Sequence, residues 1–280
     1  MIKIHVFHTG KVCVAPELPF GGENCNAIKA SGLYGKRSER LWLPVSSYLI
    51  EHPKGLFLVD TGWERGMSPR GEFDSKAQIR SLGSFPLYLV NQGVVGGGEC
   101  IDEQLQTLGI RTADLDAVLL THLDCDHANG LRQVTDAKRF LVSADELRFA
   151  GKGLQNKVRY NSAWWKGVDL TAFDWTGTDG PAYRSYDLLG DGTIKLINIP
   201  GHSDGLFAVK VSSGYKFVLL FSDGGYATRS WDEMIISGIS ANKAAQKRSL
   251  AWIREQSLDP NCLESLANHD PDIEPHIIEF

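Results

Sequence analysis

The stretch THLDCDH, residues 121–127, places two histidines and two aspartates within seven positions. In an H-x-D-x-D-H turn, alternate side chains point to opposite sides of a tight loop. His122 and Asp124 can then face one metal ion, while Asp126 and His127 face another. Imidazole and carboxylate groups are ligands for zinc, iron and manganese. The spacing therefore predicts a metal site with two ions.

Three further metal-capable residues follow hydrophobic segments that are typical of strands. His202 comes after TIKLINIPG, Asp223 after YKFVLLFS, and His269 after a segment near 263–268. Open α/β sheets place their sites just beyond strand ends. Each residue alone is commonplace, but together with the 121–127 motif they indicate one shared site. His202 and His269 would complete the two ligand groups, and Asp223 would bridge ions about 3.5–4 Å apart.

The elements around these residues alternate between strands and helices after a β-rich beginning, which predicts an α/β layered domain. Residues 45–60, VSSYLIEHPKGLFLVD, are expected to form a β-hairpin, because two apolar runs flank the turn HPKG. Other strands are expected at 115–120, 192–200 and 215–223, with a last strand and loop at 261–270, and loops with short helices at 64–98.

Helices are expected where apolar residues recur with a helical period. In 101–109, Ile101, Leu105 and Leu108 share one face. Two helix caps are also predicted: a capping box of Ser143 and Glu146 in AKRFLVSADELRFA, and Ser240 before ANKAAQKRSLAWIREQ.

Composition and charge narrow the class of protein. The chain has 280 residues, 42% of them hydrophobic, and a formal net charge of −5. It lacks a dense Lys/Arg cluster, which argues against nucleic acid as a partner. It also lacks an apolar run of the ~18 residues that a membrane span needs, and a secretory leader pattern. The cysteines are odd in number and scattered, which favours reduced thiols and a cytoplasmic location.

Residues 151–191 differ in composition from the rest of the chain. Several aromatic residues, among them Trp164 and Trp165, lie between Gly, Asp and Ser residues. We interpret the segment as a partly irregular insertion that acts as a lid over the substrate pocket or as a contact in a homodimer. Trp164 and Trp165 are accordingly expected to line the pocket.

With these residues in place, the chain resembles the metallo-β-lactamase-fold superfamily, whose signature H-x-H-x-D-H is followed by a later His, Asp and His. The resemblance covers nearly the whole chain and is closest to the N-acyl homoserine lactonases. The shared features are the hairpin LPVSSYLIEHPKGLFLVDTG at 43–62, the turn PGHSDG at 200–205, the segment DGGY at 223–226 and a terminal HD at 269–270.

The resemblance implies a single domain over residues 1–280, an α/β fold built as a four-layer αββα sandwich, and a dinuclear site. Asp60, in the DTG turn, would lie behind the metal ligands rather than bind a metal. One metal would take His122, Asp124 and His202, the other would take Asp126, His127 and His269, and Asp223 would bridge the two.

Two positions depart from the family pattern. Asp124 stands where the family usually has histidine, and Cys125 stands where an aromatic residue often lines the acyl pocket. We interpret Asp124 as a true ligand, whose oxygen donor suits manganese or iron as well as zinc. Zinc is the expected metal, and Asp124→His should retain two metals. Cys125 is expected to line the pocket, because no free histidine remains to activate its thiol.

The favoured function is hydrolysis of a lactone or an ester by a hydroxide that bridges the two metals. Tyr226 would donate a hydrogen bond to the developing oxyanion, unless its ring only packs, and Asp126 could pass a proton to the leaving alkoxide. The alternatives within the superfamily are hydrolases of a thioester, a β-lactam or a phosphodiester. The alternative of another class is a diiron redox protein or a non-catalytic metal-binding protein.

Overall fold

The first sheet of the computed structural model combines an antiparallel half with a parallel half. The structure describes residues 1–280, apart from the side chains of residues 37 and 155. Along the sheet the strands follow the order β13-β1-β2-β3-β5-β6-β7, and β4 pairs with β1. The strands are β1 (Lys3–Val14), β2 (Leu41–His52), β3 (Gly55–Val59), β4 (Gln92–Val94), β5 (Ala117–Leu119), β6 (Phe140–Ser143), β7 (Leu170–Phe173) and β13 (Ile277–Glu279).

The second sheet is built by the later part of the chain. Its order is β12-β11-β10-β9-β8, antiparallel except for the parallel pair β11–β12. Its strands are β8 (Ser185–Asp187), β9 (Ile194–Asn198), β10 (Phe207–Ser213), β11 (Lys216–Leu220) and β12 (Cys262–Leu266).

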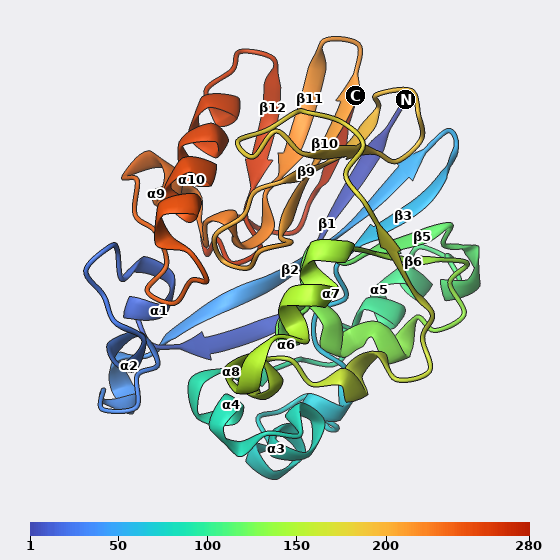
Figure 1. The fold of residues 1–280 in the computed structure, drawn as a ribbon. Helices are drawn as coiled ribbons and strands as arrows, with labels where there is room; N and C mark the ends of the chain where they lie inside the picture. Colours follow the sequence, from blue (N-terminus) through green and yellow to red (C-terminus); the bar gives the residue numbers. More distant parts are fainter.

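Helices cover the outer faces of both sheets, as Figure 1 shows. The helices are α1 (Glu17–Phe20), α2 (Ala27–Ala30), α3 (Ser75–Leu82), α4 (Phe85–Val90), α5 (Ile101–Thr107), α6 (Cys125–Ala128), α7 (Ala144–Ala150), α8 (Gly153–Arg159), α9 (Thr228–Asp232) and α10 (Lys243–Ser257). Short 3-10 helices are η1 (Arg37–Glu39), η2 (Arg65–Met67), η3 (Thr112–Asp114), η4 (Asn129–Gln133), η5 (Ser162–Trp165) and η6 (Ser222–Gly224).

Three hydrophobic clusters hold these layers together. In β3, Phe57 and Val59 point toward the second sheet, while Leu58 points toward the helices on the other side. Because successive side chains of a strand face opposite ways, a strand that is covered on both faces is apolar throughout. Leu250 and Ile253 of α10 pack on the outer face of the second sheet. The fold is therefore the predicted αββα sandwich.

The observed elements confirm the hairpin, since β2 and β3 pair from Tyr48–Val59 to His52–Gly55. Helix α5 also forms, but Leu108 does not share its buried face. The helix ends at Thr107, Leu108 takes the capping position, and its side chain is 40% exposed.

The two predicted helix caps have different outcomes. Ser143 accepts a hydrogen bond from the Glu146 backbone at 3.1 Å, as predicted, but the Glu146 carboxylate bonds elsewhere. The prediction for Ser240 is wrong. Helix α10 begins two residues later than Ser240 would allow, and the Asn242 side chain accepts from Ala245 N at 2.9 Å.

Residues 151–191 contain two strands that the sequence analysis did not predict. Strand β7 lies parallel to β6 in the first sheet, and β8 lies antiparallel to β9 in the second. Both are short, so they carry little of the periodicity that identifies a strand. The aromatic-rich segment thus contributes one strand to each sheet, and α8 and η5 precede the first of these strands, β7.

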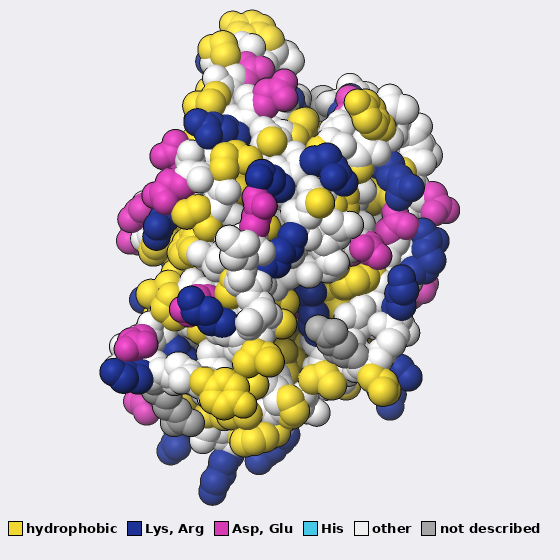
Figure 2. Space-filling model, turned by 60° about the vertical axis from the view of Figure 1, so that its left-hand side comes forward, with side chains coloured by type: hydrophobic (Ala, Val, Ile, Leu, Met, Phe, Trp, Pro, Cys, Tyr) yellow, Lys and Arg dark blue, Asp and Glu magenta, His cyan; other side chains and the backbone are white. Residues whose placement is uncertain are grey.

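The surface carries charges of both signs. Figure 2 shows lysine and arginine side chains interspersed with acidic ones on the face that it presents. Within the described part of the chain, no helix is long and apolar enough to cross a membrane. All five cysteines are free thiols.

Candidate metal centre

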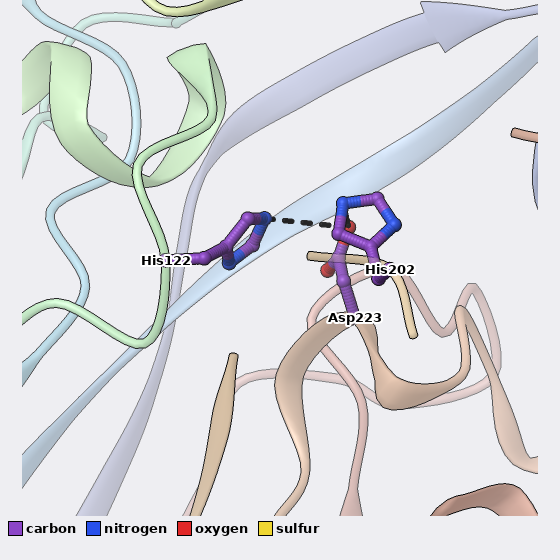
Figure 3. Close-up of side chains that lie close together, drawn as sticks. All are labelled: His122, His202 and Asp223. Carbon is purple, nitrogen blue, oxygen red and sulfur yellow. Dashed lines mark ion pairs between the residues drawn. The ribbon is translucent and has the colours of Figure 1, made fainter. Parts of the chain in front are cut away.

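The predicted metal ligands come from both sheets and meet at one end of them. The loop after β5 and the short helix α6 hold the 121–127 motif, and the other three ligands follow β9, β11 and β12. Figure 3 shows His122 approaching from one side and His202 and Asp223 from the other. All seven are buried: His122, Asp124, Asp126, His127, His202, Asp223 and His269.

The turn that carries His202 depends on Gly201. This glycine has φ +144, and a Cβ there would lie 2.3 Å from the Cα of Gln246 in α10. Only glycine fits both the backbone angle and the close contact. The PGHS sequence therefore lets the His202 loop pack against α10 and return toward the first sheet.

One group of ligand atoms surrounds a point between His122, His202 and Asp223. Oδ2 of Asp223 lies 3.9 Å from His122 Nε2 and 3.7 Å from His202 Nε2. Asp124 adds a second carboxylate, whose Oδ2 lies 3.3 Å from His122 Nε2 and 2.8 Å from His202 Nε2. Asp124 therefore faces the other ligands and not solvent.

A second group lies on the other side of Asp223. Its Oδ1 lies 3.3 Å from His127 Nε2 and 3.3 Å from His269 Nε2. Asp126 contributes Oδ1 at 3.9 Å from His127 Nε2 and Oδ2 at 3.5 Å from His269 Nε2. The two oxygens of Asp223 thus face different groups, which is the arrangement of a carboxylate that bridges two cations.

The donor atoms in both groups fit divalent metal ions. Within the described residues, the Nε2 atoms of His122, His127 and His269 and Oδ1 of Asp223 are buried without a hydrogen-bond partner. A tetrahedron with bonds of ~2.1 Å has edges of about 3.4 Å, close to the separations observed. Buried polar atoms that converge without partners are costly unless a cation satisfies them. Residues of both groups can therefore hold a metal.

Hydrogen bonds behind the ligands fix which imidazole nitrogen faces inward. Asp60 Oδ2 accepts from His127 Nδ1 at 2.8 Å, and the carbonyl of Pro44 accepts from His269 Nδ1 at 2.8 Å. Nδ1 of His122 lies 3.1 Å from Oγ1 of Thr121. With Nδ1 engaged, each Nε2 is left to present its lone pair to a metal. Asp60 therefore lies behind His127, and its role in supporting a metal ligand stays a prediction.

Burial and neighbouring charges set the protonation of the histidines. Burial, helped by the charge of His127, lowers the pKa of His122 to about 4, so this imidazole is neutral at neutral pH. Burial also opposes protonation of His127, but the carboxylates of Asp223 and Asp60 outweigh it and raise its pKa. The pKa of His269 is raised in the same way by Asp223. A divalent cation would replace these protons, so metal and proton compete here.

Arg159, at the end of α8, is a site residue that the sequence analysis missed. Its Nε lies 2.6 Å from Asp124 Oδ1, and its Nη2 lies 2.5 Å from Asp124 Oδ2. Burial opposes ionisation of Asp124, but the Arg159 guanidinium outweighs it and holds the pKa of the carboxyl well below its usual range. The surrounding NKVRYNSAWW has no motif spacing, so only the tertiary fold reveals the contact.

Glu146 is a second residue that was missed at the site, because it was assigned only to a helix cap. Its Oε1 accepts from Leu123 N at 3.1 Å and its Oε2 accepts from the Ser203 hydroxyl at 2.5 Å. Leu123 lies in the motif loop and Ser203 follows His202, so the carboxylate ties together two loops that carry ligands. Burial raises the pKa of Glu146 to about 7.

Tyr226 lies beside both ligand groups. Its ring stacks on His269 at 5.1 Å between centroids and lies 6.1 Å from the ring of His202. Burial, followed by the charge of Asp223, raises the pKa of the phenol, so it is a donor at neutral pH. This position is compatible with the predicted role of its hydroxyl, which stays a prediction.

Cys125 is buried beside the site. Asn91 Nδ2 lies 3.6 Å from its sulfur, and burial together with the charge of Asp126 raises the pKa of the thiol. A protonated thiol is a weak nucleophile, which agrees with the sequence-based expectation that Cys125 does not attack the substrate. Its part in the pocket wall stays a prediction.

The two tryptophans differ in environment. Trp164 is fully buried, and its indole N–H donates to the carbonyl of Ser81 at 3.1 Å. Because the ring is inaccessible, Trp164 packs in the core instead of lining a pocket. Trp165 is half-buried against it, with ring centroids 6.2 Å apart. A pocket role for Trp165 stays a prediction.

An αββα sandwich with paired His/Asp groups at the ends of its sheets defines a class of metal-binding proteins, many of them hydrolases. The match of a family model places the chain in that class. The chain belongs to the metallo-beta-lactamase superfamily, whose model matches residues 40–227.

Known proteins similar to this chain include lactonases. N-acyl homoserine lactonase AttM of Agrobacterium fabrum is 27% identical over 241 residues, which cover 82% of this chain and 83% of the lactonase. Among solved structures, an N-acyl homoserine lactone hydrolase with N-hexanoyl-L-homoserine bound at its catalytic metal center has a TM-score of 0.71 at 20% identity, with 96% of this chain and 94% of that chain covered. AidC, a dizinc quorum-quenching lactonase, has a TM-score of 0.65 at 16% identity, with 98% and 89% covered.

Proposed function

We propose that this protein is a dinuclear metal-dependent hydrolase that opens a lactone or cleaves an ester. The observation that supports this most directly is that the two carboxylate oxygens of Asp223 face different pairs of histidines. Its Oδ2 faces His122 and His202, and its Oδ1 faces His127 and His269. One metal would be held by His122, His202 and Asp124, the other by His127, His269 and Asp126, and Asp223 would bridge them.

Two such ions, when bound, would supply a hydroxide nucleophile at neutral pH and polarise the substrate carbonyl. Zinc is the expected metal, with manganese or iron as alternatives because oxygen donors make up nearly half of the ligand set. The protein's own side chains then orient the substrate and handle protons. The Tyr226 hydroxyl would donate a hydrogen bond to the carbonyl oxygen as negative charge develops on it. Asp126 would pass a proton to the leaving alkoxide.

The substrate class rests on the relatives. A named relative acts on N-acyl homoserine lactones, and this chain covers most of that protein's length. We therefore propose a small lactone or ester as substrate. Thioesters, β-lactams and phosphodiesters are the competing substrates within the superfamily, and a diiron redox protein or a non-catalytic metal-binding protein is the competing function of another class.

The experiment combines metal analysis with a substrate panel. Elemental analysis of purified protein is expected to give two metal equivalents per chain. Lactone opening releases a carboxylic acid, which a pH-stat records directly, and esters, thioesters, a β-lactam and a phosphodiester are tested beside it. Consumption of oxygen or a flavin absorption band, with no hydrolysis, would instead identify the redox protein.

Matched histidine variants locate the activity. His269→Gln removes a buried Nε2 that faces Asp223, whereas His276→Gln alters a histidine outside both ligand groups. We expect His269→Gln to lose metal and turnover and His276→Gln to retain both. Equal effects of the two substitutions would contradict the assignment.

Partners and location complete the proposal. A small molecule would be the only ligand besides the metals, without nucleic acid or membrane as partner, and the expected location is the cytoplasm. A homodimer remains one alternative to a monomer, and sedimentation of the metal-loaded protein distinguishes them.

A further inference from the structure

The guanidinium of Arg159 contacts two members of one ligand group at once. It binds both carboxylate oxygens of Asp124, through Nε at 2.6 Å and Nη2 at 2.5 Å. Its Nη1 donates to the backbone carbonyl of His202 at 3.2 Å, and Nη2 lies 2.7 Å from His202 Nε2. One side chain from α8 thus holds a residue of the first-sheet motif and the loop of the second sheet together.

Both partners of this ion pair are largely removed from water. The Arg159 side chain is 18% exposed and the Asp124 side chain 12% exposed. A charge in such surroundings is costly when it stands alone, and tolerated when a partner of opposite charge bonds to it with good geometry. The planar, two-point contact between guanidinium and carboxylate is the geometry that fixes the carboxylate most firmly.

We propose that Arg159 is a positioning residue for the metal centre, which pairs with Asp124 and makes a carboxylate usable as a ligand at that position. The inference rests on the proposed dinuclear function. The Arg159–Asp124 pair has no net charge. It therefore contributes the same net charge to the metal site as a neutral histidine at position 124 would. Asp124, Asp126 and Asp223 bring three negative charges, and Arg159 reduces the net charge of the ligand environment to −2.

This pairing changes what is expected of substitutions at position 124. The sequence alone predicts that Asp124→His retains two metals. In the structure, that change would leave the Arg159 guanidinium without its carboxylate, 2.7 Å from His202 Nε2 and next to the proposed metal position. The unpaired guanidinium would compete for the His202 lone pair and repel the metal. We therefore expect Asp124→His alone to lose the metal bound by His122 and His202.

Removing the charge from both partners should reverse this loss. Asp124→His combined with Arg159→Met replaces a neutral pair by two uncharged side chains and frees His202. The double variant is therefore expected to bind two metals again. Arg159→Met alone leaves the Asp124 carboxylate buried and unpaired, which destabilises the protein most when no metal neutralises that charge.

The test uses the full chain as wild type, the two single variants and the double variant. Each is stripped with a chelator and reloaded with zinc, and its stoichiometry and affinity are measured by competition with a chromophoric chelator. We expect two equivalents in the wild type. Asp124→His should hold about one, its second site weakened up to ~100-fold, and the double variant should hold two within ~10-fold of wild-type affinity.

Thermal unfolding of the stripped and reloaded proteins supplies a readout that packing alone would not change. In Arg159→Met, zinc should raise the unfolding midpoint by more than it does in the wild type, because the metal then neutralises an unpaired carboxylate. Arg65→Met is the matched control, since Arg65 makes a two-point pair with Glu103 away from the ligands. Arg65→Met should change the unfolding midpoints of the stripped and the reloaded protein by the same amount.

If Arg159→Met does not fold, Arg159→Lys takes its place. Lysine keeps the charge without the two-point geometry, so the zinc affinity of this variant should lie between those of the wild type and Asp124→His.

Three results would overturn the inference: Asp124→His with two tightly bound metals, a double variant no better than Asp124→His, or an Arg159→Met protein that gains a metal relative to wild type. The last would mean that the guanidinium takes the place of a cation. Failure of the proposed function gives a different result. A wild-type protein that binds fewer than two metals and hydrolyses nothing would refute the proposed function, whereas the Arg159–Asp124 ion pair would still stabilise the metal-free protein.

Discussion

Asp60 and His127 form a hydrogen bond of 2.8 Å, between Oδ2 and Nδ1, and neither side chain contacts solvent. The same carboxylate accepts from the backbone and the hydroxyl of Thr121, at 2.9 and 2.7 Å. One residue at the end of β3 therefore orients a predicted metal ligand and anchors the loop before it. Asp60 adopts a left-handed backbone, φ 57, which few residues other than Asn, Asp and Gly accept readily.

The substitution Asp60→Asn tests this relationship. Asparagine keeps the size and tolerates the backbone, but its neutral oxygen is a weaker acceptor for His127 Nδ1–H. Loss of such a supporting carboxylate typically lowers metal affinity ~10–100-fold. Competition with a chelator measures the change, and Asp114→Asn, at a half-buried position paired with Arg111, is the control. Unchanged affinity in Asp60→Asn would show that His127 is oriented by other contacts.

Tyr226→Phe separates catalysis from metal binding. The substitution keeps the ring stacked on His269 and removes only the hydroxyl. We expect turnover to fall by up to ~10²–10³-fold, less if the metals share the oxyanion, with two metals still bound. Tyr183→Phe, on a 78% exposed ring, controls for loss of a phenol. Wild-type kinetics in Tyr226→Phe would assign the ring to packing alone.

Glu146→Gln should alter the pH dependence of stability. The folded-state pKa of Glu146, about 7, exceeds its ordinary value of 4.5, so the folded protein binds this proton more tightly than the unfolded chain. The resulting stabilisation is complete below the ordinary pKa and is lost as the pH rises through the folded one. Glutamine does not titrate and shows no such loss. The free energy of unfolding of the variant should therefore rise relative to that of the wild type between about pH 5 and 8, by on the order of 2–3 kcal/mol.

Urea unfolding of the chelator-treated proteins measures this difference at each pH. Glu233→Gln, whose side chain is half exposed and pairs with Arg229, gives the baseline. Parallel stability curves for wild type and Glu146→Gln would show that burial does not perturb this carboxyl.

Gly62→Ala should be among the most damaging small substitutions in the chain. Gly62 has φ +63, and an added Cβ would lie 1.9 Å from Oγ1 of Thr9. Gly109 has a similar φ, +72, with open space around it, so Gly109→Ala measures the backbone cost alone, about 1 kcal/mol. Denaturant unfolding should show a clearly larger loss for Gly62→Ala, on the order of 3 kcal/mol or more. Equal losses would mean that Thr9 moves aside freely.

The candidate ligands could be recognised in the sequence because their signals are local. A dense H-x-D-x-D-H motif and three short segments after apolar strands each stand out in the printed chain, and the structure gathers them at the ends of the sheets. The same holds for the hairpin, whose two apolar strands and turn lie within twenty residues of each other.

Contacts between distant segments could not be predicted in that way. Arg159 meets Asp124 across 35 positions, and Glu146 meets Ser203 across 57, although nothing in either local sequence indicates it. Trp164 was expected at a pocket because it is aromatic, but its burial follows from how η5 packs against η4. Likewise, Leu108 has the right spacing for the buried face of α5, but the helix ends one residue earlier.

The distribution of ligands between the two sheets has a consequence for biosynthesis. The motif near residue 124 is synthesised well before His202, Asp223 and His269, which belong to the later sheet. A nascent chain that ends before β12 lacks His269, so on the proposed assignment the second ligand group is completed only when nearly the whole described chain has been synthesised. On the proposed assignment, the metals would act as cross-links between ligands from an early and a late half of the chain, so that metal binding would hold the two sheets together.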